Sequence, residues 1–408
     1  MKALRPCSGS LPFAFAALAA ISACDNKATD PVDVVKTPAT LQVSGRGGVD
    51  ERYTAEVWVV GNVGYTTTWG ARTLNGVISR GNAVKIWNAS GTAPVLVDSL
   101  IVPDATTLGD VQVSDDGKLL VVATEFVPGS IVIYDLTNPV KPQLVSRFTS
   151  ANTSPGVHTA EVQRVNGKLY AFLSVDLGGG QFAKLTIVDL SNPAAPTEVF
   201  SKEMGNPYVH DVFVRDGILM TALWNDGISI FDIGGGGKGG TVANPVLIGS
   251  MKTVGGTVHN IWWYRDATGT KRYAFVGQEG PGSIGFSSIG DIHVVDVSDL
   301  ANPHEVAFFN VPGAGTHNFS MDETRGLLYA AYYNGGVRVL DVKGDLGGCD
   351  ASMKSGDGRC DLGKMNREVG RGLTDASFPV YVWGVQVTGG KVYASDMLNG
   401  LWKLEPVP

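Results

Sequence analysis

Residues 131–135 read Ile-Val-Ile-Tyr-Asp, a short apolar strand that ends in an acidic residue. The pattern recurs, with variations, at 84–88 (Val-Lys-Ile-Trp-Asn), 185–189 (Leu-Thr-Ile-Val-Asp), 228–232 (Ile-Ser-Ile-Phe-Asp), 292–296 (Ile-His-Val-Val-Asp), 337–341 (Val-Arg-Val-Leu-Asp) and 401–405 (Leu-Trp-Lys-Leu-Glu). Repeats at a period of roughly 40 to 60 residues indicate an array of small sheets. Their unequal spacing predicts loop insertions around a constant strand core.

Each copy lies within a larger unit of four short strands. An alternating run such as 109–113 comes first, a glycine turn and a second run such as 118–123 follow, and the repeat strand is third. A fourth strand opens with proline, at Pro94, Pro142, Pro196, Pro245 and Pro303. Proline is tolerated there because the amide of an edge strand needs no ladder partner. Period-two apolar alternation between turn residues makes each unit one blade of an all-β fold.

The last blade lacks a fourth strand, because only three residues follow Glu405. Residues 38–44, Pro-Ala-Thr-Leu-Gln-Val-Ser, look like the other proline-led strands but have no blade before them. We therefore expect this N-terminal strand to pair with the C-terminal blade and close a ring, which removes exposed strand edges. The predicted fold is an all-β, seven-bladed β-propeller over residues 38–408.

The segments that follow the repeat strands carry a family resemblance. Asp-Leu-Thr-Asn-Pro at 135–139, Asp-Leu-Ser-Asn-Pro at 189–193 and Asp-Val-Ser-Asp-Leu-Ala-Asn-Pro at 296–303 resemble the LVIVD repeat of bacterial and archaeal surface proteins. The resemblance extends over most of the chain after about residue 38. It implies a β-propeller at the cell surface and no shared enzymatic activity. The copies that end in Asn88 and Glu405 depart from the terminal aspartate, and the last copy lacks the Asn-Pro step.

The N-terminal residues are typical of a targeting segment. Lys2 and Arg5 precede an apolar stretch at 11–21 that is too short to span a bilayer, and Ile-Ser-Ala-Cys at 21–24 resembles a lipoprotein signal-peptidase site. We expect a signal peptide at 1–23, an acylated Cys24 and a polar tether at 24–37. The expected location is the cell envelope, with a lipid as the membrane contact. An ordinary secretory signal cleaved nearby is the alternative.

Charge and cysteine content limit the partners and the compartment. The net charge is −7 and the charges are not clustered, which argues against nucleic acid as a partner. With Cys7 in the signal segment and Cys24 acylated, Cys349 and Cys360 remain as a pair in an oxidising setting. We expect them to form a disulfide within an insertion at about 342–365, and we expect the protein to be a monomer.

Two segments suggest ligands only superficially. The glycine-rich run 234–240 lacks the Lys-Ser/Thr ending of a phosphate loop, and a flexible insertion between strands is the better interpretation. The insertion around the two cysteines contains four aspartates that could bind calcium, but their spacing does not match the helix-loop-helix calcium loop. They are Asp345, Asp350, Asp357 and Asp361.

Aligning the first strands of the blades reveals one column of unequal residues. Three consecutive blades carry histidine at the same place, His210, His259 and His317, and the last blade carries Trp383. His158 lies two positions upstream of this column in the neighbouring blade. The next position along the strands is polar in six blades, where it is Glu56, Asp110, Glu161, Asp211, Asn260 and Asn318, and it is Gly384 in the seventh.

The first strand of a propeller blade lines the axis, so these histidines are expected at the mouth of a central channel. Three interpretations follow: imidazoles from adjacent strands bind a divalent metal, they line a metal-free ligand pocket, or they bond neighbouring blades. The metal interpretation takes His158, His210, His259 and His317 as ligands. Loops after the second strands should open onto the same face; their residues are Glu125, Asp176, Trp224–Asp226, Gln278–Glu279, Tyr333–Asn334 and Asp396–Asn399. Turn chemistry accounts for most of them, but it does not require the indole of Trp224.

The sequence contains no Gly-x-Ser-x-Gly or His-Glu-x-x-His motif and no cysteine left for nucleophilic work, so no catalytic residue is predicted. The leading hypothesis is a lipid-anchored binding or scaffold module for a protein or small-molecule ligand. The alternatives are a metalloenzyme with a histidine-bound divalent metal and a purely structural envelope protein. The predicted ligand-binding residues are His210, His259, His317, Trp224, Trp383, Asp211, Asn260 and Asn318; His293 and His304 are expected to be ordinary blade residues.

Overall fold

The computed structural model describes residues 37–178, 180–374 and 377–408. All of the described residues belong to one compact unit. The expected signal peptide, Cys24 and most of the tether lie outside the described residues. Within the described part, no helix has the length and hydropathy that crossing a membrane would require.

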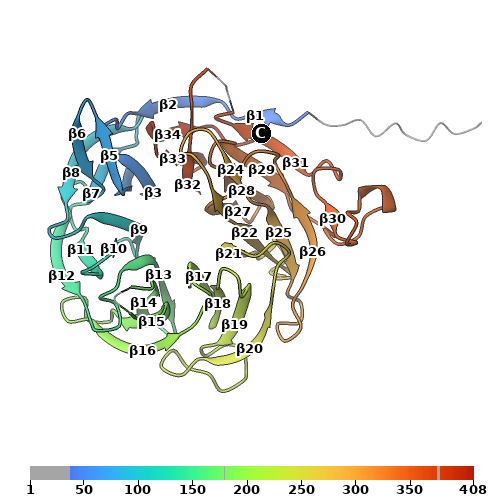
Figure 1. The fold of residues 1–408 in the computed structure, drawn as a ribbon, viewed down its shortest axis with the longest axis horizontal. Helices are drawn as coiled ribbons and strands as arrows, with labels where there is room; N and C mark the ends of the chain where they lie inside the picture. The colour runs from blue at the N-terminus through green and yellow to red at the C-terminus, as the bar shows by residue number, and fades with distance from the viewer. Residues whose placement is uncertain (1–36, 179, 375–376) are drawn as a thin grey trace, which may run out of the picture. The chain divides into compact units, whose positions relative to one another are not determined.

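The strands of the second unit form seven sheets of four or five strands in the described residues, arranged around a common axis (Figure 1). The all-β, seven-bladed propeller predicted from the sequence is confirmed. Blade 1 comprises β3 (Tyr53–Val60), β4 (Val63–Trp69), β7 (Ala83–Asn88) and β8 (Val95–Ile101). Blade 2 comprises β9 (Thr107–Val113), β10 (Leu119–Glu125), β11 (Ser130–Asp135) and β12 (Gln143–Phe148). Blade 3 comprises β13 (Val157–Val165), β14 (Lys168–Val175), β15 (Lys184–Asp189) and β16 (Thr197–Glu203).

The remaining blades follow the same order around the ring. Blade 4 comprises β17 (Asp211–Arg215), β18 (Ile218–Ala222), β19 (Ile228–Asp232) and β20 (Val246–Met251). Blade 5 comprises β21 (Val258–Trp263), β22 (Tyr273–Gln278), β25 (Ile292–Asp296), β26 (His304–Phe309) and β30 (Cys360–Asp361). Blade 6 comprises β27 (Phe319–Asp322), β28 (Leu327–Ala331), β29 (Val337–Asp341), β31 (Glu368–Gly372) and β1 (Ala39–Thr40). Blade 7 comprises β32 (Val382–Thr388), β33 (Lys391–Asp396), β34 (Gly400–Leu404) and β2 (Val43–Gly47).

Two small hairpins extend from loops between second and third strands. They are β5 (Ala71–Leu74) with β6 (Val77–Arg80) in blade 1, and β23 (Gly280–Pro281) with β24 (Ser288–Ile289) in blade 5. The one helix in the described residues is a 3₁₀ turn, Ala351–Met353.

The repeat strand is apolar because it lies inside its blade, with a neighbouring strand on each side and another blade against each face. In β11, Ile131 and Ile133 are fully buried against blade 3, and Val132 is buried against blade 1. A strand buried on both faces reads as a continuous apolar run, whereas the outer strand β12 exposes Leu144 to solvent. The pattern that identifies the repeats is therefore the pattern of blade-to-blade packing.

Ring closure by N-terminal residues is confirmed, with one difference from the expected strand at 38–44. Val43–Gly47 pairs antiparallel with β34 of blade 7, but Ala39–Thr40 pairs parallel with β31 of blade 6. The chain changes partner at Leu41, which is buried between these two blades. One apolar side chain seated at the blade boundary thus splits the expected strand into two short ones.

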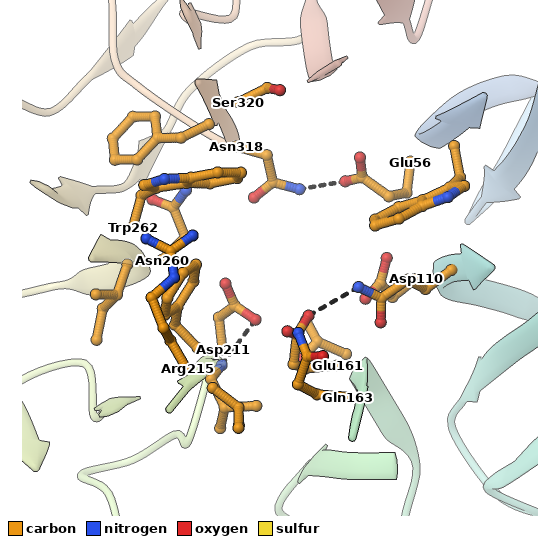
Figure 2. Close-up of a pocket in the computed structure, with 18 of the residues that line it drawn as sticks. Glu56, Asp110, Glu161, Gln163, Asp211, Arg215, Asn260, Trp262, Asn318 and Ser320 are labelled. Carbon is orange, nitrogen blue, oxygen red and sulfur yellow. Dashed lines mark hydrogen bonds between the residues drawn. The ribbon is translucent and has the colours of Figure 1, made fainter. Parts of the chain in front are cut away.

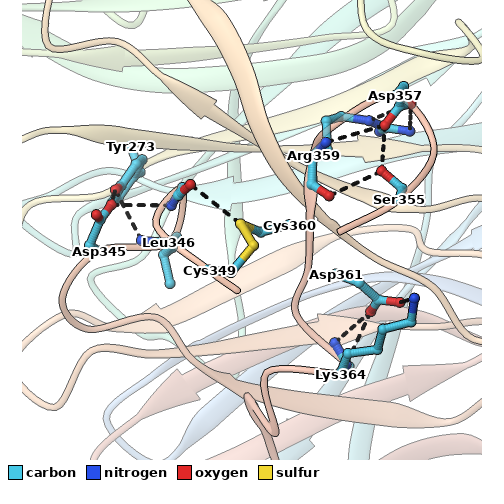
Figure 3. Close-up of a disulfide and its surroundings, with 12 residues drawn as sticks. Tyr273, Asp345, Leu346, Cys349, Ser355, Asp357, Arg359, Cys360, Asp361 and Lys364 are labelled. Atoms are coloured by element: carbon cyan, nitrogen blue, oxygen red, sulfur yellow. Dashed lines mark hydrogen bonds and ion pairs between the residues drawn. A yellow bond between two sulfur atoms is a disulfide. The ribbon is translucent and has the colours of Figure 1, made fainter. Parts of the chain in front are cut away.

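The predicted disulfide between Cys349 and Cys360 is present (Figure 3). Its loop leaves blade 6 after β29, and β30 pairs parallel with β26, so the insertion extends the sheet of blade 5. The insertion's aspartates point to separate partners: Asp345 accepts a hydrogen bond from the Tyr273 hydroxyl, and Asp357 pairs with Arg359. Among the described residues, the groupings of metal-ligating side chains include none of the four aspartates.

The glycine-rich run 234–240 has a defined internal contact. Five backbone amides, those of residues 234, 235, 236, 238 and 240, donate hydrogen bonds to the carboxylate of Asp232. Burial alone would raise the pKa of Asp232, but these amide bonds outweigh it and hold the pKa well below its usual value. The run is an insertion between strands, as expected, and it folds around the last residue of a repeat strand.

Candidate functional site at the channel mouth

The four histidines of blades 3 to 6 form a continuous arc. The ring centroids of His158 and His210 lie 4.3 Å apart, those of His210 and His259 4.2 Å, and those of His259 and His317 4.0 Å. The convergence expected from the sequence alignment is therefore observed, although the four side chains have different partners.

Three further side chains close the arc into a ring around the axis. Trp383 of blade 7 lies 4.3 Å from His317, and Trp69 of blade 1 lies 5.7 Å from Trp383, between ring centroids. The Trp69 indole donates a hydrogen bond to Glu125 Oε2 of blade 2 at 3.2 Å, and Glu125 Oε1 lies 3.0 Å from His158 Nδ1. We call these seven side chains, one from each blade, the mouth ring: Trp69, Glu125, His158, His210, His259, His317 and Trp383.

Bulges in the inner strands explain why two consecutive columns can face the channel. The pairing of first and second strands shifts register between Val157 and Thr159, between Val258 and Asn260, and between Val382 and Gly384. A β-bulge places an extra residue against one partner and re-aims its side chain. His158, His259 and Trp383 are the extra residues, and at His259 the bulge lets the next residue, Asn260, line the channel as well.

Three of the imidazoles are buried without a charged partner of their own. His317 Nδ1 lies 2.7 Å from the carbonyl oxygen of Trp383, so this nitrogen carries the hydrogen and Nε2 carries the lone pair. In the described part of the chain, His210 Nδ1 and both nitrogens of His259 have no hydrogen-bond partner. Burial, followed by the neighbouring histidines, lowers the pKa of all three well below 6.5, so they are neutral at pH 7.

The carboxylate of Glu279 lies among these three imidazoles. Its Oε2 is 3.5 Å from His210 Nε2 and 3.9 Å from His259 Nε2, and its Oε1 is 4.0 Å from His317 Nε2. Oε1 also accepts a hydrogen bond from the Tyr333 hydroxyl. Burial raises the pKa of Glu279, although this hydrogen bond and the charge of His158 oppose the shift. Sequence reasoning placed Glu279 among ordinary turn residues, because nothing in its local pattern reveals the histidines of other blades.

His158 belongs to a separate group. Burial alone would lower its pKa, but the charge and hydrogen bonding of Glu125 outweigh burial and raise the pKa of His158 to about 10. The side chain is therefore a cation at pH 7. Asp176 completes this group, and its burial raises its pKa to about 6. The four histidines that the metal interpretation takes as ligands are thus one charged histidine, His158, and three neutral ones.

Two aromatic residues cover the mouth ring from the loops after the second strands. Trp224 stacks on His210, with centroids 5.2 Å apart and planes inclined by 20°. Tyr333 lies 4.9 Å from His317. Both residues have left-handed backbones, with φ of 53° and 43°. Large residues are rarely held in this strained conformation except where the surroundings enforce it, which occurs often at functional sites.

The polar column of the inner strands forms a second tier deeper in the channel (Figure 2), which encloses a cavity of about 680 Å³. Asp211, Asn260 and Asn318, each next in sequence to a histidine of the mouth ring, line this cavity (Figure 2). Here Asn318 Nδ2 donates to Glu56 Oε2 across blade 7, and Gly384 makes room, because a Cβ at Gly384 would lie 2.4 Å from Glu56 Oε1. Some contacts in the tier join blades, since the amide of Ala160 donates to Asp110 Oδ2 at 3.2 Å.

The carboxyl groups of this tier bind protons more tightly than free ones do. Burial raises the pKa of Glu56 and of Glu161 to about 8 and that of Asp110 to about 6; for Glu56, the nearby charge of Asp110 adds to the shift. The pKa of Asp211 is raised well above its ordinary value for the same reason. The tier is therefore partly protonated at pH 7, which limits the negative charge in the channel.

Comparison with known families agrees with this architecture. The model of the LVIVD repeat matches residues 180–203 and 288–311, which contain the third and outer strands of blades 3 and 5. A search of curated proteins found no match. The chain is a seven-bladed β-propeller that contains LVIVD repeats.

Proposed function

We propose that this protein is a binding module of the cell envelope whose ligand enters the channel mouth and contacts the mouth ring. The observation that supports this most directly is the set of buried nitrogens on His210 and His259 that have no hydrogen-bond partner in the described residues. Buried polar atoms are almost always paired, because an unmade hydrogen bond costs about 1–3 kcal/mol. A bound ligand would supply the missing partners.

The alternative that these histidines only join blades is less consistent with the contacts. Blades are joined by other side chains of the inner strands: Gln112 accepts a hydrogen bond from the amide of Val162, and Ser320 accepts one from the amide of Val387 at 2.9 Å. The imidazoles of His210 and His259 make no such bond within the described chain. The stability lost by burying these unpartnered nitrogens is then explained if they serve to bind a ligand.

Native mass spectrometry of the protein purified from its own cells tests the binding function. We expect a bound molecule or ion in the wild-type protein that is lost from Trp224→Ala and His210→Ala. The matched control is His304→Ala, because His304 is exposed on β26, away from the mouth ring. An adduct that persists in both mouth variants, or no adduct at all, contradicts the proposal.

Attachment to the envelope through Cys24 is part of the same proposal. The disulfide between Cys349 and Cys360 supports an oxidising, exported setting. We expect Cys24→Ala to move the protein from the membrane fraction to the soluble exported fraction and to abolish labelling by a radioactive fatty acid. Unchanged labelling or unchanged fractionation excludes the lipid anchor and favours an ordinary secretory signal.

A further inference from the structure

The ligand atoms of His210, His259 and Glu279 lie within 4.8 Å of one another; His259 and Glu279 are buried, and the His210 side chain is 12% exposed. The Glu279 oxygen is 3.5 Å and 3.9 Å from the two Nε2 atoms. Bonds of about 2.0–2.2 Å arranged tetrahedrally around one ion place ligand atoms about 3.3–3.6 Å apart. The two separations from the Glu279 oxygen are therefore within a few tenths of an ångström of those around a metal ion, and the two imidazoles lie within 4.8 Å of each other.

The hydrogen-bond pattern distinguishes this group from ordinary polar packing. Glu279 Oε2 lies too far from either imidazole for a strong hydrogen bond, and both His259 nitrogens are unpartnered in the described chain. By contrast, His158 Nδ1 lies 3.0 Å from Glu125 Oε1, so this imidazole has a carboxylate of its own close by. The imidazoles with unpartnered nitrogens in the described chain are those of His210 and His259, which lie next to Glu279.

The surroundings provide the support that metal ligands require. Tyr333 donates its hydroxyl hydrogen to Glu279 Oε1, which fixes the carboxylate and leaves Oε2 directed at the two imidazoles. Such second-shell hydrogen bonds commonly orient metal ligands. The channel cavity is lined by His259 and by Trp383 of the mouth ring, so one of the three side chains borders open space.

We propose that His210, His259 and Glu279 bind a divalent transition-metal ion and leave a fourth coordination position open toward the mouth. Two imidazoles and one carboxylate form a ligand set that suits zinc and related ions. This inference rests on the proposed binding function, because it identifies the component of the mouth that would contact the ligand. The fourth position is then taken by water or by a donor atom of the incoming molecule.

Metal titration of the full-length purified protein, stripped with a chelator, tests the site. We expect one equivalent of Zn²⁺ by calorimetry, and Co²⁺ should give the visible absorption of a four-coordinate ion. Glu279→Gln, which keeps the shape of the side chain, and His259→Ala should weaken Zn²⁺ binding by more than about 100-fold, and Tyr333→Phe by about 10-fold. His304→Ala, which removes an exposed imidazole, should leave binding unchanged.

Binding of Zn²⁺ that persists in Glu279→Gln, or its loss in His304→Ala, overturns the assignment, as does the absence of binding to a folded wild-type protein. If His259→Ala fails to fold by circular dichroism, Glu279→Gln and Tyr333→Phe still decide the question. The two proposals can fail separately. An organic adduct that requires Trp224, found in a protein that binds no Zn²⁺, retains the binding function and excludes the metal.

Discussion

At the scale of single residues, the last position of each repeat strand ends the strand with a specific hydrogen bond. The side chains of Asn88, Asp135, Asp189, Asp232, Asp296 and Asp341 each accept a hydrogen bond from the backbone amide two residues later, at 2.7–3.1 Å. Short polar side chains commonly end strands in this way. In the seventh copy Glu405 instead accepts hydrogen bonds from Ser44 and Lys391, because no blade turn follows it.

This capping role predicts unequal effects of substitution. Asp232 is buried and accepts five amide hydrogens, so Asp232→Ala should lower the free energy of unfolding by roughly 2–4 kcal/mol. Asp135 caps its turn with the single amide of Thr137, and Asp135→Ala should have a much smaller effect. Urea unfolding of the two variants measures the difference. Equal losses in the free energy of unfolding would mean that the hydrogen bonds from the glycine-rich run to Asp232 add no stability.

The buried carboxyl groups of the channel predict a pH dependence. The pKa of Glu161 is about 8 in the folded protein and about 4.5 when the group is free, so the folded state binds more protons between these values. The contribution of Glu161 to the free energy of unfolding should therefore fall as the pH rises from about 4.5 to 8, by about 1.4 kcal/mol for each unit of pKa difference, whereas the neutral histidines of the mouth ring act in the opposite direction below pH 6.5. The charge of Asp110 adds to the raised pKa of Glu161, and the charge of Arg215 opposes it. Glu56, whose pKa is also raised, should change the free energy of unfolding in the same direction as Glu161.

Thermal unfolding between pH 4.5 and 9 measures this dependence. Glu161→Gln keeps the shape of the side chain without the titration, so it should flatten the curve. Glu203→Gln is the matched control, because Glu203 is an exposed glutamate of β16 in the same blade. The interpretation is wrong if the wild-type protein does not lose stability relative to Glu161→Gln as the pH rises, or if both variants change the curve equally.

The residues of the mouth ring differ in how far the sequence could predict them. His210, His259, His317 and Trp383 were found by aligning first strands, because blades with a common register place equivalent residues at equal height. Trp69 and Glu125 come from the ends of second strands, and that alignment does not include those ends. Glu279 has no distinguishing local pattern, so only the folded ring shows that it meets histidines from three blades.

At the scale of elements, the repeats predict the four-stranded blades, and insertions add strands that the repeats do not predict. The strand β30 is two residues long and pairs with a blade that precedes its own in the chain. No local signal specifies such a partner, because the contact depends on how far the disulfide-closed loop reaches. Arg359 within the insertion also pairs with Glu305 of β26, which in turn contacts His293. The insertion is therefore a packed part of blade 5.

Reduction of the Cys349–Cys360 disulfide should accordingly destabilise the protein. The bond closes a loop with a sequence separation of 11 residues, for which the loss of chain entropy in the unfolded state corresponds to about 2–3 kcal/mol. Urea unfolding with and without reductant should show this difference for the wild-type protein. The double variant Cys349→Ser/Cys360→Ser should have the same unfolding midpoint with and without reductant. An unchanged wild-type midpoint after complete reduction would show that the insertion unfolds independently of blade 5.

At the scale of the whole molecule, the ring depends on contacts between the two ends of the propeller. Removing residues 1–47 deletes β2 and Leu41, which leaves β34 as an open edge and exposes the apolar boundary of blades 6 and 7. We expect a loss of more than about 3 kcal/mol in the free energy of unfolding, since a buried leucine alone contributes about 2–3 kcal/mol. The open edge should also promote association between copies.

A variant that begins at residue 37 is the matched control for this truncation, because it keeps both N-terminal strands. Light scattering coupled to size exclusion should show a monomer for the control and larger species for the variant that begins at residue 48. Adding a peptide of residues 38–47 should restore part of the lost stability, since it can pair again with β34. A monomer of unchanged stability after the deletion would mean that the packing between neighbouring blades, rather than the closing strand, holds the ring together.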